Sequence, residues 1–377
     1  MEERWILLGL YEMEGIGKKS ISKLIEGGHL LQEMFLYDEG DWIAAGMRRD
    51  QAARLAKCFD VNWVESRRQH VYDRGIEVIT YLDSNYPILM KETPQPPWIM
   101  YARGDIQLLH QPSIAMVGTR MPTVYGRKVA EKLAEQLSQA GLTVVSGLAR
   151  GIDRVCHESV LRANGKTIAV FGTGIDCCVY PPENRGLAEQ IAEKGLLLSE
   201  YPLGTKARQG LFPERNRIIA GLTLGTLVVE ADVRSGSLIT ADAALEAGRD
   251  VFAVPGPITS PKSRGAHNLI RQGAKMVTCA DDLLEEYRLD LQNVEQLPYN
   301  RERSPEKLDL AERSWFPKVE RTADENRVIV LLEQEELTVD QLIDRLGWDF
   351  GHLHSVLLSL IIKKQIRQLP GTKYARV

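Results

Sequence analysis

The chain has 377 residues, of which 44% are hydrophobic and 26% are charged, and its formal net charge is −4. This length exceeds what one hydrophobic core usually supports, and the composition is typical of a globular protein, so we expect two or three domains. An acidic chain has no global attraction to nucleic acid, which means that any such partner requires a local basic patch.

Residues 1–70 are predicted to form a small helical domain. Within it, LYEMEGIGKKSISKLIE resembles a helix-hairpin-helix or SAM-like element with Gly15 and Gly17 in the hairpin, where backbone amides can hold a phosphate. A helical bundle whose glycines only make a tight turn explains the same residues, and both interpretations stay open. Residues 71–112, with Tyr86, Pro87 and three further prolines, are predicted to be an irregular extension to the core.

The segment 113–285 is predicted to be a Rossmann-like α/β domain with a doubly wound, mostly parallel sheet. Short apolar runs alternate there with longer amphipathic ones. The predicted strands are 113–118, 142–147, 167–172, 196–200, 225–231 and 250–256. Between the first two, Val129, Leu133 and Leu137 share one face and Gly141 follows, which predicts a crossover helix. Ligands of such sheets bind outside the carboxyl ends of the strands.

The C-terminal part is predicted to contain a linker and a winged helix. Residues 286–325 are rich in Glu, Asp, Arg and Pro and lack apolar periodicity, which indicates a linker. Residues 326–377 show three helical segments and then a hairpin around Pro370 and Gly371, the order of elements in a winged helix. DNA contact and docking of a protein through a basic edge are both open for this domain.

Several familiar sites are excluded by the loops themselves. The loop GTRMPTVYG is not GxGxxG, and the second strand ends in Ser146-Gly147-Leu148 where a carboxylate for the ribose hydroxyl would be expected, so a dinucleotide cofactor is disfavoured. The triplet at 165–167 precedes a strand and lacks the first glycine of a P-loop. HExxH and GxSxG motifs are absent from the sequence. We therefore expect no catalytic residue, no metal and no cofactor.

Cysteine usage and the start of the chain indicate the compartment. The five cysteines are odd in number and show no CxxC spacing, which argues against a disulfide framework and a zinc knuckle. No apolar run is long enough to span a bilayer, and MEERWILLGL lacks the features of a signal peptide. We expect a cytoplasmic protein without a membrane partner.

The loops after the predicted strands are rich in groups that bind oxygen anions. The stretch between Leu203 and Ile218 contains four basic residues and one acidic residue, which gives a local charge of +3 in an acidic chain. Arginines, glycine amides and hydroxyls suit phosphates, and an aromatic ring among arginines offers bases a stacking surface. The predicted contacts are Gly118, Thr119, Arg120, Ser146, Gly147, Gly172, Gly174, Lys206, Phe212, Arg215, Asn216, Arg217, Ser235, Gly236 and Ser237.

Ordered motifs give a resemblance to a known family. VGTR, VSGLARGID, AVFGTGID, YPPEN, SEYP, FPERNRIIAGL, SGSLITADAALEAGRDVFAVPG and GAHNLIRQGA occur in this order between about 113 and 275. The chain resembles the DNA-processing protein A family (DprA, also called Smf). The resemblance implies a non-catalytic protein that binds and protects incoming single-stranded DNA. It also implies assistance in loading RecA recombinase onto that strand against single-strand-binding protein, in natural transformation and recombination, and a homodimer formed through the Rossmann-like domain.

The resemblance also assigns roles to individual residues. It implies DNA contact by Arg120, Lys206, Phe212, Arg215, Asn216 and Arg217. Our hypothesis is that Arg215 and Arg217 begin a helix whose N-terminus faces the phosphates. At least one of the two is expected to be structural, and the alternative for it is an ion pair with Glu214 or Glu230.

Two other functions remain as alternatives. A nucleotide-processing enzyme, such as a nucleoside-monophosphate phosphoribohydrolase, shares a Rossmann-like fold and needs a carboxylate over the ribose, for which Glu230 is the candidate. However, Asp153, Asp176 and Glu230 have no histidine or lysine at a spacing that suggests acid–base work, and turn capping is the role predicted for them. A protein-interaction scaffold is the third alternative, and it leaves the many anion donors unexplained.

Overall fold

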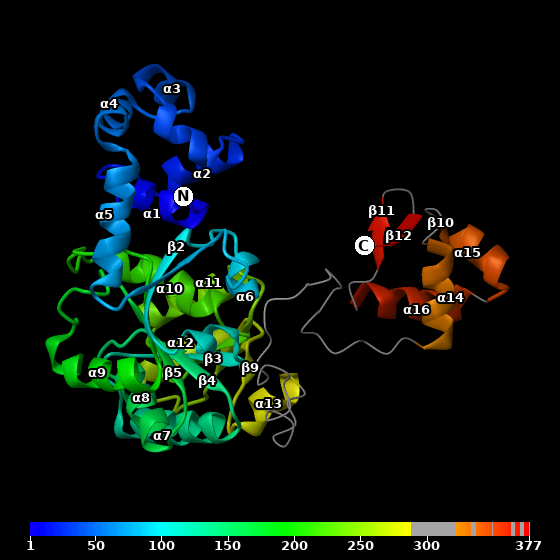
Figure 1. Cartoon of the computed structure of the whole chain (residues 1–377). Helices are drawn as coiled ribbons and strands as arrows, with labels where there is room; N and C mark the ends of the chain where they lie inside the picture. Colours follow the sequence, from blue (N-terminus) through cyan, green and yellow to red (C-terminus); the bar gives the residue numbers. More distant parts are fainter. Residues whose placement is uncertain (288–321, 333–336, 349, 363–365, 370–372, 377) are drawn as a thin grey trace. The chain divides into compact units, whose positions relative to one another are not determined.

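The computed structural model describes residues 1–287, 322–332, 337–348, 350–362, 366–369 and 373–376 (Figure 1). The chain divides into two compact units, Met1–Tyr299 and Asn300–Val377, which are considered separately below. In the described ranges, no helix has the length and apolar character needed to cross a membrane.

A nine-stranded sheet forms the centre of the first unit, in the order β1-β2-β6-β5-β4-β3-β7-β8-β9. The strands are β1 Glu77–Thr80, β2 Ile99–Gly104, β3 Ser113–Val117, β4 Thr143–Ser146, β5 Thr167–Phe171, β6 Leu196–Ser199, β7 Gly225–Val228, β8 Asp250–Ala253 and β9 Lys275–Met276. All neighbours from β6 to β9 are parallel. The chain runs outward from β3 to β6 and then returns to β7 beside β3, so the sheet is doubly wound, as predicted.

The prediction that residues 71–112 are irregular is wrong. Strands β1 and β2 form an antiparallel hairpin there, and β2 pairs antiparallel with β6 at the edge of the sheet. The short helices α6 Ile88–Lys91 and η2 Ile106–His110 complete the segment. The prolines lie in the connection between the two strands and not in the strands, which are too short to show a clear periodicity.

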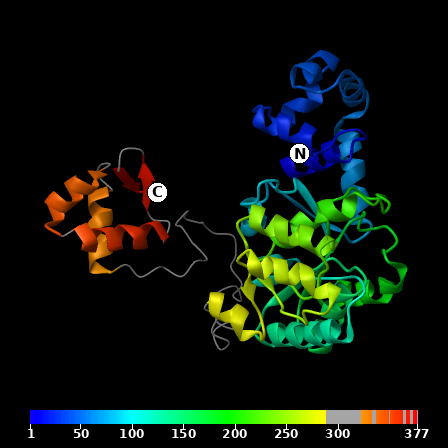
Figure 2. The same ribbon diagram turned by 180° about the vertical axis from the view of Figure 1, so that it is seen from behind.

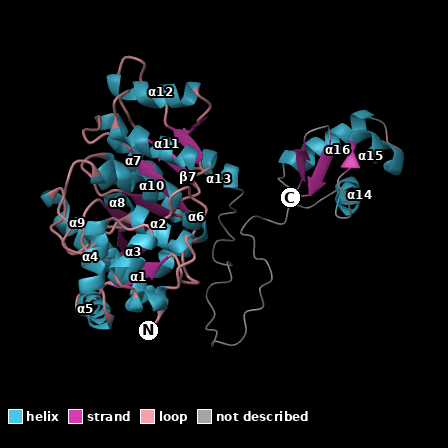
Figure 3. Ribbon diagram, turned by 90° about the horizontal axis from the view of Figure 1, so that it is seen from above, coloured by secondary structure: helices cyan, strands magenta, loops and turns pink. Residues whose placement is uncertain are grey.

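Helices cover both faces of this sheet. One face carries α7 Val124–Gln139, α8 Ile152–Arg162, α9 Arg185–Lys194 and α13 Asp281–Tyr287, and the other carries α10 Leu211–Gly221, α11 Gly236–Glu246 and α12 Arg264–Arg271. Helices α10 and α11 lie side by side (Figure 2). Figure 3 shows the strands in the interior of this unit with helices around them. The predicted crossover helix is α7, with Leu133 and Leu137 buried and Gly141 following at a φ of +81°.

The first 72 residues are helical and share a hydrophobic core with the sheet. The elements are α1 Glu3–Tyr11, α2 Lys18–Glu26, η1 Leu31–Leu36, α3 Glu39–Ala44, α4 Arg49–Cys58 and α5 Val61–Tyr72. Their buried apolar residues form one cluster with Tyr101 of β2 and with Ala169 and Phe171 of β5. The helical prediction is confirmed, while a boundary near residue 70 stays a prediction because the core is continuous across it.

The second unit is a winged helix, as predicted. It consists of α14 Ala323–Leu332, β10 Leu337–Thr338, α15 Val339–Leu346, α16 Phe350–Ile362, β11 Ile366–Leu369 and β12 Lys373–Arg376, with the strand order β10-β12-β11. Val328, Leu342, Leu353 and Leu357 fill its core. The predicted turn residues Pro370 and Gly371 lie outside the described residues, and so does most of the predicted linker 286–325.

Candidate nucleic-acid interface

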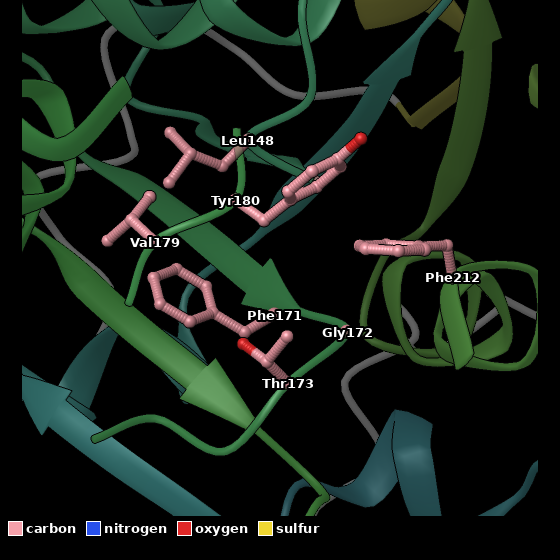
Figure 4. A pocket seen from close by; sticks show the side chains of 8 residues that line it. Leu148, Phe171, Gly172, Thr173, Val179, Tyr180 and Phe212 are labelled. Atoms are coloured by element: carbon pink, nitrogen blue, oxygen red, sulfur yellow. The ribbon is translucent and has the colours of Figure 1, made fainter. Parts of the chain in front are cut away.

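Two adjoining cavities open at the carboxyl ends of β4 and β5. The first is lined by Gly147, Leu148, Phe171, Gly172, Thr173, Val179, Tyr180 and Phe212 (Figure 4). The second is lined by Arg120, Gly147, Ala149, Arg150, Tyr180, Pro181, Phe212 and Arg215. They share Gly147, Tyr180 and Phe212, and we call them together the aromatic cleft. This is the edge of the sheet at which a ligand was predicted to bind.

Two aromatic rings stand on either side of the aromatic cleft. The ring centroids of Tyr180 and Phe212 are 5.4 Å apart with an interplanar angle of 40°, and Tyr180 is 51% exposed. Phe212 lies in the first turn of α10 and packs onto the backbone of Gly172, where a Cβ atom would lie only 2.7 Å from the Phe212 ring. Glycine at 172 therefore lets Phe212 approach, and the two rings offer a planar base a surface for stacking.

Arg120 places an exposed positive charge at the aromatic cleft. It is exposed after β3 and makes no hydrogen bond or ion pair within the described ranges. Arg150 also lines the aromatic cleft, but its guanidinium donates to both carboxylate oxygens of Glu183. Lys206 is exposed and without a partner among the residues described, in the loop between β6 and α10, and it does not line the cavities. The sequence interpretation missed Arg150, although its loop was among those identified.

Arg215 lies beneath the aromatic cleft and is only 4% exposed. Its Nη1 donates to the carbonyls of Gly147, at 2.8 Å, and of Val170, and so joins the ends of β4 and β5. Burial lowers its pKa to about 10, against the attraction of Asp153. The hypothesis that the two arginines begin a helix is wrong, because α10 begins at Leu211 and places Arg215 one turn inside it.

Arg217 and Asn216 make their contacts with other parts of the protein. Arg217 donates to the buried carboxylate of Glu200 and to the Gln95 carbonyl, so its ion pair is not with either glutamate that we expected. Asn216 Nδ2 donates to the Gly236 carbonyl at 3.4 Å, which joins α10 to the start of α11. Neither residue lines the aromatic cleft.

Most of the other predicted anion donors already have partners inside the protein. Ser146 is buried and donates to the Met116 carbonyl at 2.7 Å, and the Gly147 amide donates to Asp153. Internal hydrogen bonds also engage the hydroxyls of Thr119, Ser235 and Ser237 and the amide of Gly174. A Cβ at Gly118 would lie 2.6 Å from Ile152. These residues shape the loops, and the structure leaves fewer groups facing the cleft than the sequence suggested.

The three carboxylates near the strand ends hold backbone amides, as predicted. Asp153 accepts from Gly147 N and Ala149 N. Asp176 accepts from Gly204 N at 2.8 Å. Glu230 is 3% exposed and accepts from the Thr123 amide at 2.8 Å and the Thr123 hydroxyl at 2.7 Å. Glu230 is thus fully engaged in the loop after β3, which weakens its candidacy as a catalytic carboxylate.

His157 of α8 is a buried titratable group beneath this region. It is fully buried, and its Nδ1 lies 2.7 Å from the Thr167 hydroxyl, which itself donates to the Val144 carbonyl, so Nδ1 carries the proton. Burial, with the nearby Arg215 charge, lowers the pKa of His157 to about 3.

Acidification is therefore expected to destabilise the wild type through His157. The unfolded chain binds a proton near pH 6.5 and the folded chain does not, so the free energy of unfolding falls by up to about 1.4 kcal/mol per pH unit below 6.5. Urea unfolding at several pH values between 5 and 7 measures this slope. His157→Gln removes the titrating group and should flatten the slope by that amount. An identical slope in the variant would assign the dependence to other residues.

The comparisons with known proteins agree with this fold and give the family. The family model for DNA recombination-mediator protein A matches residues 77–288, and the DprA winged helix domain matches residues 314–372. Protein Smf of Synechocystis sp. is 38% identical over 98% of this chain and 89% of its own length. DNA processing protein DprA of Streptococcus pneumoniae is 40% identical over 72% of this chain and 94% of its own.

Two solved structures are similar as well. The X-ray structure of DprA from Streptococcus pneumoniae has a TM-score of 0.60 and 35% identity, covering 76% of this chain and 98% of that one. DNA processing protein A from Helicobacter pylori has a TM-score of 0.51 and 30% identity, covering 56% of this chain and 94% of that one. On its sequence motifs, its fold and these matches, the chain belongs to the DNA recombination-mediator protein A family, the DprA or Smf proteins.

Proposed function

We propose that this chain binds single-stranded DNA at the aromatic cleft without altering it chemically. The observation that carries the proposal is Arg120, which has no partner among the described residues, beside the exposed ring of Tyr180 and the partly exposed ring of Phe212. Bases that are not paired can stack on such rings while a phosphate reaches the guanidinium. Lys206 lies in the loop before α10 and adds a second phosphate contact along the strand.

The related structures support this assignment. The Helicobacter pylori protein is described for its unique single-stranded DNA binding mode, and this chain shares its fold at 30% identity. From the family we further propose that the protein works in the cytoplasm, protects incoming single strands and helps RecA recombinase load against single-strand-binding protein during natural transformation.

We also propose that two copies associate through the Rossmann-like domain. Among the described residues the sheet ends at β9, whose two residues pair on one side only, with β8. Met276 of β9 is 51% exposed. An unpaired strand edge with an exposed apolar side chain is a surface that a second copy can cover.

Binding is tested by fluorescence anisotropy of labelled oligo-dT and of a duplex of the same length over a salt series. We expect tighter binding to the single strand, because a duplex keeps its bases away from Tyr180 and Phe212. Two phosphate contacts, at Arg120 and Lys206, predict that log K falls with log salt with a slope of about −1.4 or steeper, at about 0.7 per phosphate. Equal binding to both DNAs, or none, would contradict the proposal.

A further inference from the structure

Exposed apolar side chains gather on the loops that follow β3, β7 and β8, beyond the aromatic cleft. Met121 and Val124 are each 74% exposed, Val233 is 50% exposed and Ile258 is 87% exposed. Single exposed apolar residues are common on protein surfaces, but several on neighbouring loops indicate a surface that meets a partner.

Hydrogen bonds hold these three loops together. The Thr119 amide donates to the Glu230 carbonyl at 2.7 Å, which ties the β3 loop to the β7 loop. The Lys262 ammonium donates to the Met121 carbonyl and ties the β8 loop to the β3 loop. Tyr125 adds a second tie to the β8 loop through its hydroxyl, which donates to the Pro255 carbonyl at 2.6 Å. The apolar residues therefore sit on one fixed surface.

The charge of this surface favours an anionic partner. Its basic residues are Arg120, Arg234, Lys262 and Arg264, the last at the start of α12. The exposed acid in the loops 118–123, 229–235 and 254–264 is Asp232, since Glu230 is buried. Four positive charges against one negative charge give a local excess of +3 in a chain of net charge −4. Arg234 and Arg264 make no hydrogen bond or ion pair with any described residue.

We propose that the DNA strand leaves the aromatic cleft at Arg120 and continues across these three loops, which we call the edge track. The inference rests on the proposed function and adds a second stretch of contact to it. From β5 to β8 the sheet order crosses four strand spacings, about 19 Å. That distance accommodates about five stacked nucleotides at roughly 3.4 Å each. Arginines of the edge track bind phosphates, and Met121 and Ile258 contact the bases.

The length of the oligonucleotide distinguishes the edge track from the aromatic cleft. The variant Arg234→Gln/Arg264→Gln removes two exposed charges whose side chains make no hydrogen bond or ion pair with a described residue, so we expect it to fold as the wild type does. On dT20 it should bind about 10-fold more weakly at 0.15 M salt, with a salt slope shallower by about 1.4. On dT2, which is too short to reach from the aromatic cleft to Arg234 and Arg264, its affinity in competition assays should match that of the wild type.

A second variant tests the apolar contacts. A matched control tests whether the loss of binding depends on where the two charges are removed. Met121→Ser/Ile258→Ser should weaken dT20 binding about threefold while the salt slope stays unchanged, because no phosphate contact is lost. Lys132→Gln/Lys194→Gln neutralises two exposed lysines on α7 and α9 and should change neither value.

Three outcomes would overturn the edge track, and they differ from one another. If Arg234→Gln/Arg264→Gln binds dT20 with the affinity and the salt slope of the wild type, the surface is assigned to a protein partner instead of DNA. Equal losses on dT2 and dT20 would mean that the arginines act on the aromatic cleft itself. Failure of the wild type to bind either oligonucleotide would remove the proposed function along with the track.

Discussion

The variant Arg120→Glu/Lys206→Glu is expected to lose single-strand binding by at least about 100-fold and to keep the wild-type melting temperature. Each hydrogen bond to a charged group contributes roughly 1.5–3 kcal/mol, so the loss of two exceeds what a 100-fold change requires. The reversed charges also repel the strand. Both side chains are exposed and have no partner in the described part of the chain, so folding does not depend on them.

Fluorescence anisotropy with labelled dT20 measures the affinity for the single strand. Thermal unfolding monitored by circular dichroism measures the melting temperature. Lys132→Glu/Lys194→Glu is the matched control, since it makes the same charge change on exposed lysines of α7 and α9. Arg120 lines the aromatic cleft and Lys206 does not, so the single variant at Arg120 should cause the larger loss. Unchanged binding by the folded double variant would remove both residues from the site.

The strands of the doubly wound sheet were predictable because each is a short apolar run with a turn on either side. All six predicted strands are present, and the helical segments at both ends of the chain are too. The hairpin of β1 and β2 was not predictable, because its prolines suggested an irregular loop and its pairing with β6 is a contact between distant segments. Strand β9 has two residues and no pattern to detect.

The position of the candidate site could be predicted from the sequence, but the contacts of its arginines could not. Loops after parallel strands meet at one edge of the sheet, and this placed Arg120 and Phe212 together. A count of local charge treats all arginines alike. Arg215 is buried, and Arg217 forms an ion pair with Glu200. Both contacts depend on the residue at which α10 begins and on which face of this helix packs against the sheet.

Arg215→Met is expected to lower the free energy of unfolding of the first unit by about 3–5 kcal/mol, the usual cost of leaving a buried charge without its partner. The guanidinium is the donor to the Gly147 and Val170 carbonyls, and its charge attracts Asp153. Burial raises the pKa of Asp153, and the positive charge of Arg215 is the largest influence that opposes this rise. Without Arg215, the carboxylate is left buried with two amide hydrogen bonds alone.

Urea unfolding, monitored through hydrogen exchange of the β4 and β5 amides, measures this loss in the free energy of unfolding. Arg208→Met is the control, an exposed arginine in the loop before α10 whose side chain has no partner among the described residues, and it should change stability by less than about 0.5 kcal/mol. Adding Asp153→Asn to Arg215→Met should recover about 1–3 kcal/mol, because the uncompensated charge is then gone. A loss below about 1 kcal/mol in Arg215→Met, or no recovery in the double variant, would show that the arginine does not hold the loops through its charge.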